Sequence, residues 1–429
     1  MLNKEKLKKL NKIVYKDKSV EVLNRILNKT ALVDLSTDSN DNLDTVFNIE
    51  IKTHNVVDQK STGRCWSYAG LNILREEVIK KCNLEDFELS GSYIAFFDKL
   101  ERFNTFMERL YKYKKEGKDV YDKYVSSLLK IGFDDGSTFT EFKELIKKYG
   151  VVPKNMFSNS FGSNDTVEVN DILSRLIRKY YLELEKTNDI DKLKDKYLQY
   201  AYKVLVIVYG VIKEKFDFEY IDNNGEYHID KGLTPKKFYD KYIGVDLDDY
   251  IEVYSFKDKK YDYNKTYILE EGSLVSTNKD TYVLNLEYKR LEELIIKQLK
   301  NNELVYFSSS TTTKYTNGIW IDLMKRYSDI FNIDLNMNSN DIFKTYGTFL
   351  EHSMVLTGVS IINNRVKKWK LENSWGDKVG DNGYFIAEEE FVKNYLISVV
   401  INKKYLNKEE KKILETKPII VSKWDYKFC

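Results

Sequence analysis

Three side chains in this sequence have the chemistry that nucleophilic catalysis requires: Cys65, His352 and Asn373. A thiolate that attacks a carbonyl carbon needs a general base or an imidazolium partner. His352 can take the thiol proton and later return it. The side-chain oxygen of Asn373, 21 positions further on, can accept a hydrogen bond from the ring and fix its orientation. In the order Cys, His, Asn, these residues predict a catalytic triad.

Cys65 lies where a helix is expected to begin, at the end of the run Gln59-Lys60-Ser61-Thr62-Gly63-Arg64-Cys65-Trp66. A helix N-terminus presents free N–H groups and the positive end of the helix dipole, and both favour the reactive thiolate. Arg64 adds a neighbouring positive charge. A single cysteine is more often buried and inert, and we expect this of the thiols of Cys82 and Cys429, which have no such setting.

His352 opens a run of small and apolar residues that favours a strand. Asn373 is followed by Ser-Trp-Gly, and Trp375 is placed to shield a His–Asn hydrogen bond from water. The other histidines are His54, in a strand or loop before the cysteine, and His228, in a polar turn. Taken singly, such a histidine is more often a core residue and such an asparagine a turn residue, so only the combination predicts catalysis.

The elements that must position these residues change in type along the chain. Apolar residues at helical spacing predict helices over 66–80, 90–114, 140–149 and 170–205. Short runs that favour strands, separated by Gly, Asn and Asp, cover 354–362, 366–372, 384–387 and 397–402. Helices in the first half and strands in the C-terminal third predict an α+β fold.

The motifs around the three triad residues resemble those of papain-like cysteine peptidases, and most closely the bleomycin hydrolase / aminopeptidase C group. That group carries Gln-Lys-x-x-Gly-Arg-Cys-Trp around its nucleophile, as this chain does at 59–66. The resemblance extends from about residue 50 to the end of the chain, through the segments 87–93, 97–102, 148–153, 169–173, 418–420 and 424–425.

The resemblance implies a role for each matching residue. Cys65 would be the nucleophile, His352 its base and later acid, and Asn373 the group that orients the histidine. Gln59 would donate to the oxyanion together with the backbone N–H of the nucleophile. Trp375 would shield the site. The residues expected to bind substrate are Trp66, Gly136, Ser137 and Cys429.

The spacing predicts an inserted domain. His352 follows Cys65 by 287 residues, whereas secreted papain-type enzymes place the histidine about 130–150 residues after the cysteine. By resemblance, the fold is a papain-like two-lobed core, with a helical lobe and a β-barrel-like lobe, plus a large mainly helical insertion. We expect an N-terminal helical arm, the nucleophile lobe, the insertion, the β-rich lobe with His and Asn, and a C-terminal arm, at 1–50, 51–135, 136–290, 291–415 and 416–429.

Two segments depart from the group. Its Asp-Gly-Gly-Gln-Trp segment appears as Asp-Gly-Ser-Thr-Phe, so Ser137 adds a side chain beside the substrate strand. In the group, the C-terminal carboxylate pairs with the substrate's free amine. Here only four residues follow Asp425, about two fewer than usual, which is about 7 Å of reach. Cysteine peptidase chemistry is therefore expected, and selection for the free amine is left open.

Composition argues against several other classes of protein. With 69 Lys+Arg against 67 Asp+Glu, the net charge of +2 disfavours nucleic acid as a partner. The lysine-rich stretches 4–12 and 112–118 are more typical of solvated helix faces. Neither a phosphate-binding glycine loop nor a zinc ligand set is present, and no cofactor is expected. The start of the sequence has no apolar core of the kind a secretory signal needs, and the longest apolar run, 204–212, is about half a membrane span, so a cytoplasmic location is expected.

The function expected is that of an intracellular thiol aminopeptidase, which removes N-terminal residues from short peptides through an acyl-enzyme. By resemblance, the enzyme would be a homohexamer with its active sites facing an inner channel. The alternatives are a cysteine endopeptidase, an amide hydrolase or an acyl transferase without amine selection. A ring-forming binding protein with a vestigial site is the non-enzymatic alternative.

Overall fold

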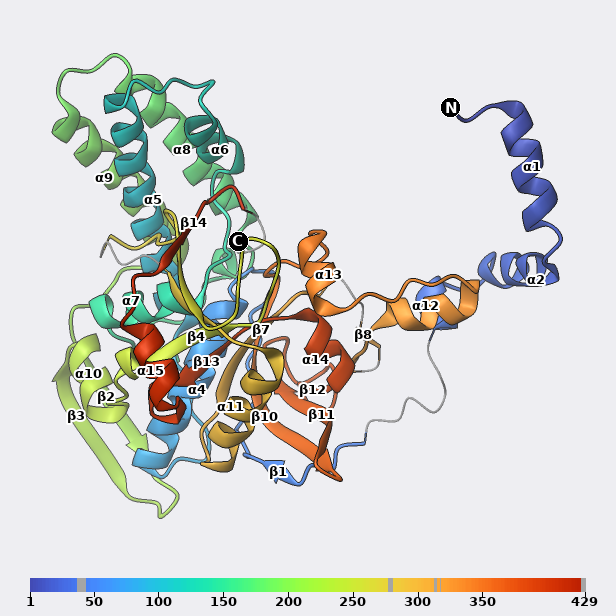
Figure 1. Ribbon diagram of the computed structural model, residues 1–429. Helices are drawn as coiled ribbons and strands as arrows, with labels where there is room; N and C mark the ends of the chain where they lie inside the picture. Colours follow the sequence, from blue (N-terminus) through green and yellow to red (C-terminus); the bar gives the residue numbers. More distant parts are fainter. Residues whose placement is uncertain (37–43, 277–280, 312–314, 317, 426–429) are drawn as a thin grey trace.

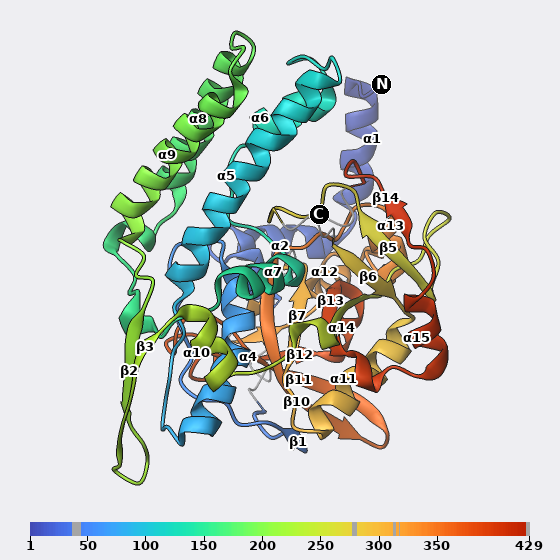
Figure 2. The ribbon, with the colours of Figure 1, turned by 90° about the vertical axis from the view of Figure 1, so that its left-hand side faces the viewer.

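The computed structural model describes residues 1–36, 44–276, 281–311, 315–316 and 318–425. It combines 15 helices with one large mixed sheet, so the fold is of the mixed α/β type. Figures 1 and 2 show long helices above one end of the sheet and shorter helices around it. None of the described helices is both long and apolar enough to cross a membrane.

The helical part is built from long amphipathic segments. Figure 2 shows α5, α8 and α9 running beside one another, and α5 packs on both α8 and α9. Ser90 begins α5 by accepting a hydrogen bond from the Tyr93 N–H, which satisfies one of the free donors of the first turn. The helices of this part are α4 (Cys65–Cys82), α5 (Gly91–Lys115), α6 (Lys123–Ile131), α7 (Phe139–Tyr149), α8 (Val167–Leu184), α9 (Ile190–Tyr209) and α10 (Pro235–Tyr242).

The strands run in the order β14-β5-β6-β4-β13-β7-β10-β11-β12-β9-β8, and β1 also pairs with β10. Their bounds are β1 (Ile49–Glu50), β4 (Tyr250–Tyr254), β5 (Lys265–Leu269), β6 (Tyr282–Asn285), β7 (Val305–Ser309), β8 (Tyr315–Thr316), β9 (Ile319–Trp320), β10 (His352–Ile362), β11 (Arg365–Glu372), β12 (Tyr384–Glu388), β13 (Leu396–Asn402) and β14 (Ile419–Val421). A separate hairpin pairs β2 (Phe216–Ile221) with β3 (Tyr227–Leu233).

The remaining helices flank the sheet or precede it. Those along the sheet are α11 (Tyr288–Lys300), α13 (Ser339–Lys344), α14 (Glu389–Tyr395) and α15 (Lys408–Leu414), whereas Figure 1 shows α12 (Leu323–Phe331) to the side of the sheet, beyond β8. At the N-terminus, α1 (Lys4–Val14), α2 (Lys18–Leu27) and α3 (Leu32–Leu35) contain no buried residue. Figure 1 shows α1 and α2 well to the side of the sheet.

The predicted elements that carry the triad are confirmed. The helix expected at 66–80 is α4, and the strands expected at 354–362 and 366–372 are β10 and β11. The single helix expected over 170–205 is instead two helices, α8 and α9. The break occurs where Asp189 accepts from the Lys192 N–H, because a side-chain cap of this kind starts a new helix.

The sheet also contains strands from residues 136–290, which were expected to form a mainly helical insertion. Within it, β4 pairs with β13 and β6 pairs with β4. A strand leaves its backbone donors and acceptors unpaired until a neighbour supplies partners. Here the partner strand lies far along the chain, so hydrophobic spacing alone does not reveal the pairing. The five-part division itself stays a prediction.

Candidate active site

The nucleophile candidate begins α4 and is buried. The side chain of Cys65 is 8% exposed, and α4 packs against β10 and β7. Close packing of α4 on α7 depends on Gly70, because a Cβ there would lie 2.5 Å from the ring of Phe142. On its other side, α4 packs against β10, the strand that begins with His352.

The resting thiol is not activated in the way the sequence suggests. Burial raises the pKa of the Cys65 thiol, and the backbone N–H groups of Ser353, Trp66 and Cys65 itself only partly oppose this. Arg64 does not turn toward the sulfur: its Nη2 donates to the carbonyl of Ser163, 2.8 Å away. Arg64 is not among the groups that lower the pKa of the thiol, and desolvation is the largest effect on it. A thiolate favoured by Arg64 stays a prediction.

The histidine and asparagine candidates are brought together at the start of β10 and the end of β11. His352 Nε2 lies 2.8 Å from Asn373 Oδ1, and both side chains are buried. The ring of Trp375 stacks on the imidazole, with 4.9 Å between centroids and 29° between planes. Burial lowers the pKa of His352 to about 4, so the imidazole is neutral near pH 7 and able to act as a base.

Cysteine and histidine meet through the residue next to the histidine. The backbone N–H and the hydroxyl of Ser353, the residue after His352, act to lower the pKa of the Cys65 thiol against the effect of burial. Because Asn373 occupies Nε2 of the His352 ring, Nδ1 is the nitrogen left for proton exchange with the thiol. The structure thus brings His352 and Asn373 together, and α4, which begins at Cys65, packs against the strand that begins at His352.

Gln59 lies in a short segment held between the two halves of the cluster. Its backbone N–H donates to the carbonyl of Ser374 over 2.8 Å, so it is tied to the residue after Asn373. Its buried Nε2 donates to the carbonyl of Thr62 over 2.6 Å. A side-chain amide nitrogen carries two protons, so one N–H remains for a further acceptor. The role of Gln59 as a donor to an oxyanion at Cys65 stays a prediction.

The predicted substrate residues occupy different positions. Gly136 and Ser137 line a cavity of about 400 Å³, together with Leu350 and Trp424. Trp66 is only 1% exposed, and its indole N–H donates to the carbonyl of Asp135 over 2.6 Å, so it supports the wall of this cavity from behind. Cys429 lies outside the described residues.

Sequence reasoning missed the buried cluster around Asp135. Its Oδ2 accepts from the Gly63 N–H at 3.0 Å, and its Oδ1 lies 2.6 Å from Lys99 Nζ. Burial alone would raise the pKa of this carboxyl, but Lys99, Thr166 and Asn170 hold it well below its usual range. The ionised carboxylate fixes the turn that leads into Cys65. The adjacent Gly136 is the only local signal of this role.

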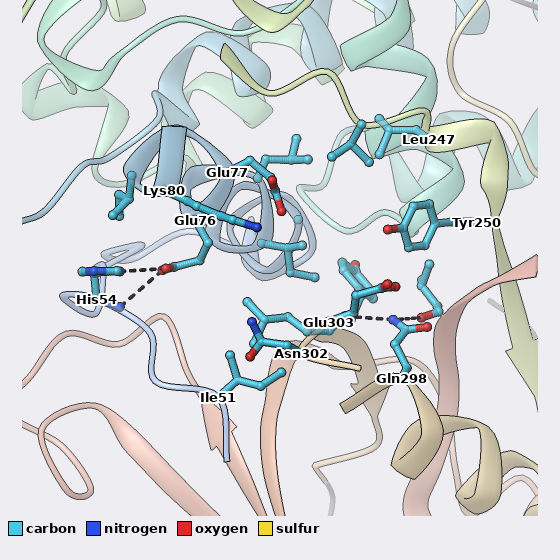
Figure 3. A pocket seen from close by; sticks show the side chains of 18 of the residues that line it. Ile51, His54, Glu76, Glu77, Lys80, Leu247, Tyr250, Gln298, Asn302 and Glu303 are labelled. Carbon is cyan, nitrogen blue, oxygen red and sulfur yellow. Dashed lines mark hydrogen bonds and ion pairs between the residues drawn. The ribbon is translucent and has the colours of Figure 1, made fainter. Parts of the chain in front are cut away.

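The two other histidines lie elsewhere. Figure 3 shows His54 beside Glu76, with 2.7 Å between Nδ1 and Oε2, in a second cavity of about 550 Å³ that neither Cys65 nor His352 lines. His228 belongs to the β2–β3 hairpin. There it forms, with Asp222 and Glu226, a group of potential metal ligands that shares no residue with the triad. Composition does not distinguish the three histidines, but the residues packed around each of them do.

Comparison with known proteins supports one class. The profile of the Peptidase C1-like family matches residues 1–427. Aminopeptidase C of Lactobacillus helveticus is 35% identical over 395 residues, covering 89% of this chain and 88% of that protein. Aminopeptidase E of the same species is 36% identical over 389 residues, with 89% and 88% covered. The crystal structure of PepW from Lactobacillus rhamnosis HN001 superposes with a TM-score of 0.92 at 31% identity, covering 99% and 98% of the two chains.

The chain therefore belongs to the Peptidase C1-like family. The resemblance to the bleomycin hydrolase / aminopeptidase C group, based on the residues around Cys65, His352 and Asn373, is confirmed over nearly the whole chain. The protein is a cysteine peptidase.

Proposed function

We propose that the protein is a thiol aminopeptidase that uses Cys65, His352 and Asn373 to remove N-terminal residues from short peptides. One observation carries the residue assignment. The 2.8 Å bond between His352 and Asn373 leaves Nδ1 available beside the buried thiol at the start of α4. The relatives named aminopeptidase C support the reaction class.

In the proposed mechanism, His352 Nδ1 takes the Cys65 proton as the sulfur attacks the scissile carbonyl carbon. The N–H groups of Gln59 and of the Cys65 backbone stabilise the oxyanion, and each such donor contributes a few kcal/mol in known acyl transfer. The imidazolium then protonates the leaving amine, which gives an acyl-enzyme. Water, deprotonated by the neutral ring, releases the N-terminal residue and restores the thiol.

Selection for a free amine is proposed to come from the C-terminal arm. The arm approaches the cavity that Gly136 and Ser137 line as β14, which pairs in parallel with β5. Neither Cys65 nor His352 lines this cavity. Lys423 Nζ then lies 2.6 Å from Glu271 Oε2, and the ring of Trp424 meets that of Tyr124 edge-on, with 5.0 Å between centroids. Lys423 and Trp424 line the same cavity as Gly136. An arm anchored there would limit the substrate to one residue beyond the scissile bond.

The test is hydrolysis of two fluorogenic amides that differ only at the α-amine, one free and one N-acetylated, under reducing conditions. We expect cleavage of the free-amine substrate alone, lost in Cys65→Ala. Cys82→Ala, which removes a buried thiol elsewhere on α4, is the matched control and should retain activity.

Each other outcome points to a defined alternative. Cleavage of both substrates would keep the triad and replace the aminopeptidase with an endopeptidase, amide hydrolase or acyl transferase. Activity that survives in Cys65→Ala would overturn the nucleophile. Absence of hydrolysis across a broad substrate panel would favour a ring-forming binding protein with a vestigial site.

We propose further that the chain has two lobes and forms a homohexamer in the cytoplasm. Two large hydrophobic clusters support the lobes, one built mainly on the helices before residue 250 and one on the strands and α11. Exposed apolar residues along α1, Leu7, Leu10 and Val14, support assembly, because they occur at helical spacing without burial in their own chain.

A further inference from the structure

A buried ion pair joins the helix that begins at Cys65 to the strand that ends just before Asn373. Arg75 on α4 and Glu372, the last residue of β11, lie with 2.7 Å between Nη2 and Oε1. The side chain of Arg75 is 1% exposed, and that of Glu372 is fully buried. Arg75 follows the predicted nucleophile by ten residues on one helix, and Glu372 directly precedes the predicted orienting residue. The ion pair therefore connects the helix of the nucleophile to the strand that leads into the asparagine.

The same guanidinium also holds the chain segment that leads to Gln59. Arg75 Nη1 donates to the carbonyl of Asn55 over 2.6 Å, and Nη2 donates to the carbonyl of His54 over 3.3 Å. Its Nε donates to Glu76 Oε1, 3.2 Å away on the same helix. Because the five N–H donors of a guanidinium lie in one rigid plane, these bonds fix its position in several directions. One side chain thus ties together α4, the end of β11 and the segment before Gln59.

The cost of burying this ion pair argues for a role other than stability. Two charges lose their hydration on burial, and well-packed apolar side chains of similar volume often give an equally stable fold. In agreement, burial raises the pKa of Glu372, and the attraction of Arg75 only partly opposes this. Directional hydrogen bonds do what apolar contacts do not: they fix one element relative to another, and catalytic groups need placement within about 0.5 Å.

We propose that Arg75 and Glu372 are positioning residues, which hold Asn373, and through it the His352 ring, in place relative to Cys65. The inference rests on the proposed function, in which these last three residues form the triad. Since Glu372 and Asn373 are adjacent, a shift of the carboxylate also moves the amide oxygen that lies 2.8 Å from His352 Nε2. A misplacement of about 1 Å at a catalytic group can lower the rate about 100-fold.

The test replaces the ion pair by apolar side chains of similar size, as Arg75→Met with Glu372→Leu. We expect the midpoint of urea unfolding to be unchanged or higher. On whichever of the two fluorogenic amides the wild type cleaves, kcat should fall about 10- to 100-fold with little change in KM. Arg75→Lys is a milder second variant. It keeps the charge but loses the planar set of donors, so its kcat should lie between those of the wild type and the double variant.

The Asn373→Ala background separates positioning from a purely structural role. If the ion pair acts through Asn373, its replacement in that background should lower kcat by no more than about twofold, because the contact that it positions is already absent. Equal losses of kcat in the two backgrounds would overturn the proposal.

A second ion pair supplies the matched control. Arg290 on α11 and Glu410 on α15 lie with 2.6 Å between Nε and Oε1. Arg290→Met with Glu410→Gln removes this ion pair and keeps an acceptor that can cap α15, so kcat should stay unchanged. A loss of kcat as large as that in Arg75→Met with Glu372→Leu would contradict a role specific to the pair beside the triad.

Alkylation of Cys65 by iodoacetamide, followed by mass spectrometry of the peptide that contains it, tests the proposal without a substrate. The reaction should slow in Arg75→Met with Glu372→Leu, because a misplaced imidazole no longer assists ionisation of the thiol. If the wild type cleaves neither amide, the proposed function fails, and slower alkylation would still support positioning. Unchanged kcat and unchanged alkylation would overturn the positioning role and leave the peptidase assignment intact.

Discussion

At the scale of single residues, the orientation of the His352 ring and its pKa have different causes. Asn373 Oδ1 accepts from His352 Nε2 at 2.8 Å and also from the Ser374 N–H at 2.8 Å, so the amide oxygen is fixed from two sides. Trp375 covers the imidazole. These contacts set the direction of Nδ1, whereas burial sets the ring's low pKa. Loss of the asparagine should therefore affect turnover more than substrate binding.

Asn373→Ala is expected to lower kcat about 10- to 100-fold with little change in KM, because a hydrogen bond that the imidazolium makes in the transition state is lost. Asn373→Asp keeps an acceptor oxygen in the same place and should recover part of the loss. Steady-state kinetics on the free-amine substrate gives both constants. Equal activity of the two variants would contradict an orienting role for this side chain.

At the scale of elements, one buried carboxylate joins the sheet to the helical part. Glu252 on β4 accepts from the Thr140 N–H at 3.0 Å, in the first turn of α7. It is 3% exposed, and burial, with nearby Glu141, raises its pKa to about 7. A carboxylate at a helix N-terminus is electrostatically favoured, but here the desolvation of the charge is larger.

This raised pKa predicts the direction of a pH effect on stability. The contribution of Glu252 is fully present below its unfolded pKa of 4.5 and is lost as pH rises through about 7. Glu252→Gln keeps an acceptor without the charge, so its free energy of unfolding relative to wild type should rise by about 2–3 kcal/mol between pH 4.5 and 8. Urea unfolding across that range measures it. If the difference in free energy of unfolding between Glu252→Gln and wild type stays constant with pH, ionisation of Glu252 does not destabilise the fold.

At the scale of the whole molecule, the N-terminal arm is the part whose position is least accounted for by packing within one chain. Its three helices bury no residue, although α3 packs near the sheet through Val33, and the carbonyl of Ser36 accepts from Arg326. The arm is thus attached at its base while α1 and α2 lie to the side of the sheet (Figure 1). Apolar helix faces of this kind gain stability by burial against another surface.

Deletion of residues 1–36 is expected to lower the oligomeric state, because it removes the exposed apolar face of α1 from the proposed assembly interface. Sedimentation equilibrium should give about six times the 50.7 kDa chain mass for the full chain and a smaller multiple for the deletion. Leu10→Glu, a single charge on that face, should act in the same direction. A full chain that sediments as a monomer would contradict the assembly.

Much of the fold could be predicted because its signals are local. The start of α4 at Cys65, the Ser90 cap of α5, the strand that begins at His352 and the strand that ends just before Asn373 follow from spacing and capping within a few residues. The pairing of β4 with β13 could not be predicted, since it joins residues about 150 positions apart and depends on which backbone groups remain unpaired.

The chemistry could be read from the amino-acid order alone: the residue types of the predicted triad, their order, and the surrounding motifs that resemble one group of cysteine peptidases. The electrostatics of these residues depends on the folded chain. Desolvation depends on everything packed around a group, so it was packing that raised the pKa of the Cys65 thiol, lowered that of His352 and turned Arg64 away. Packing also brought α4 against β7 and β10, which come from segments that lie far apart in the chain.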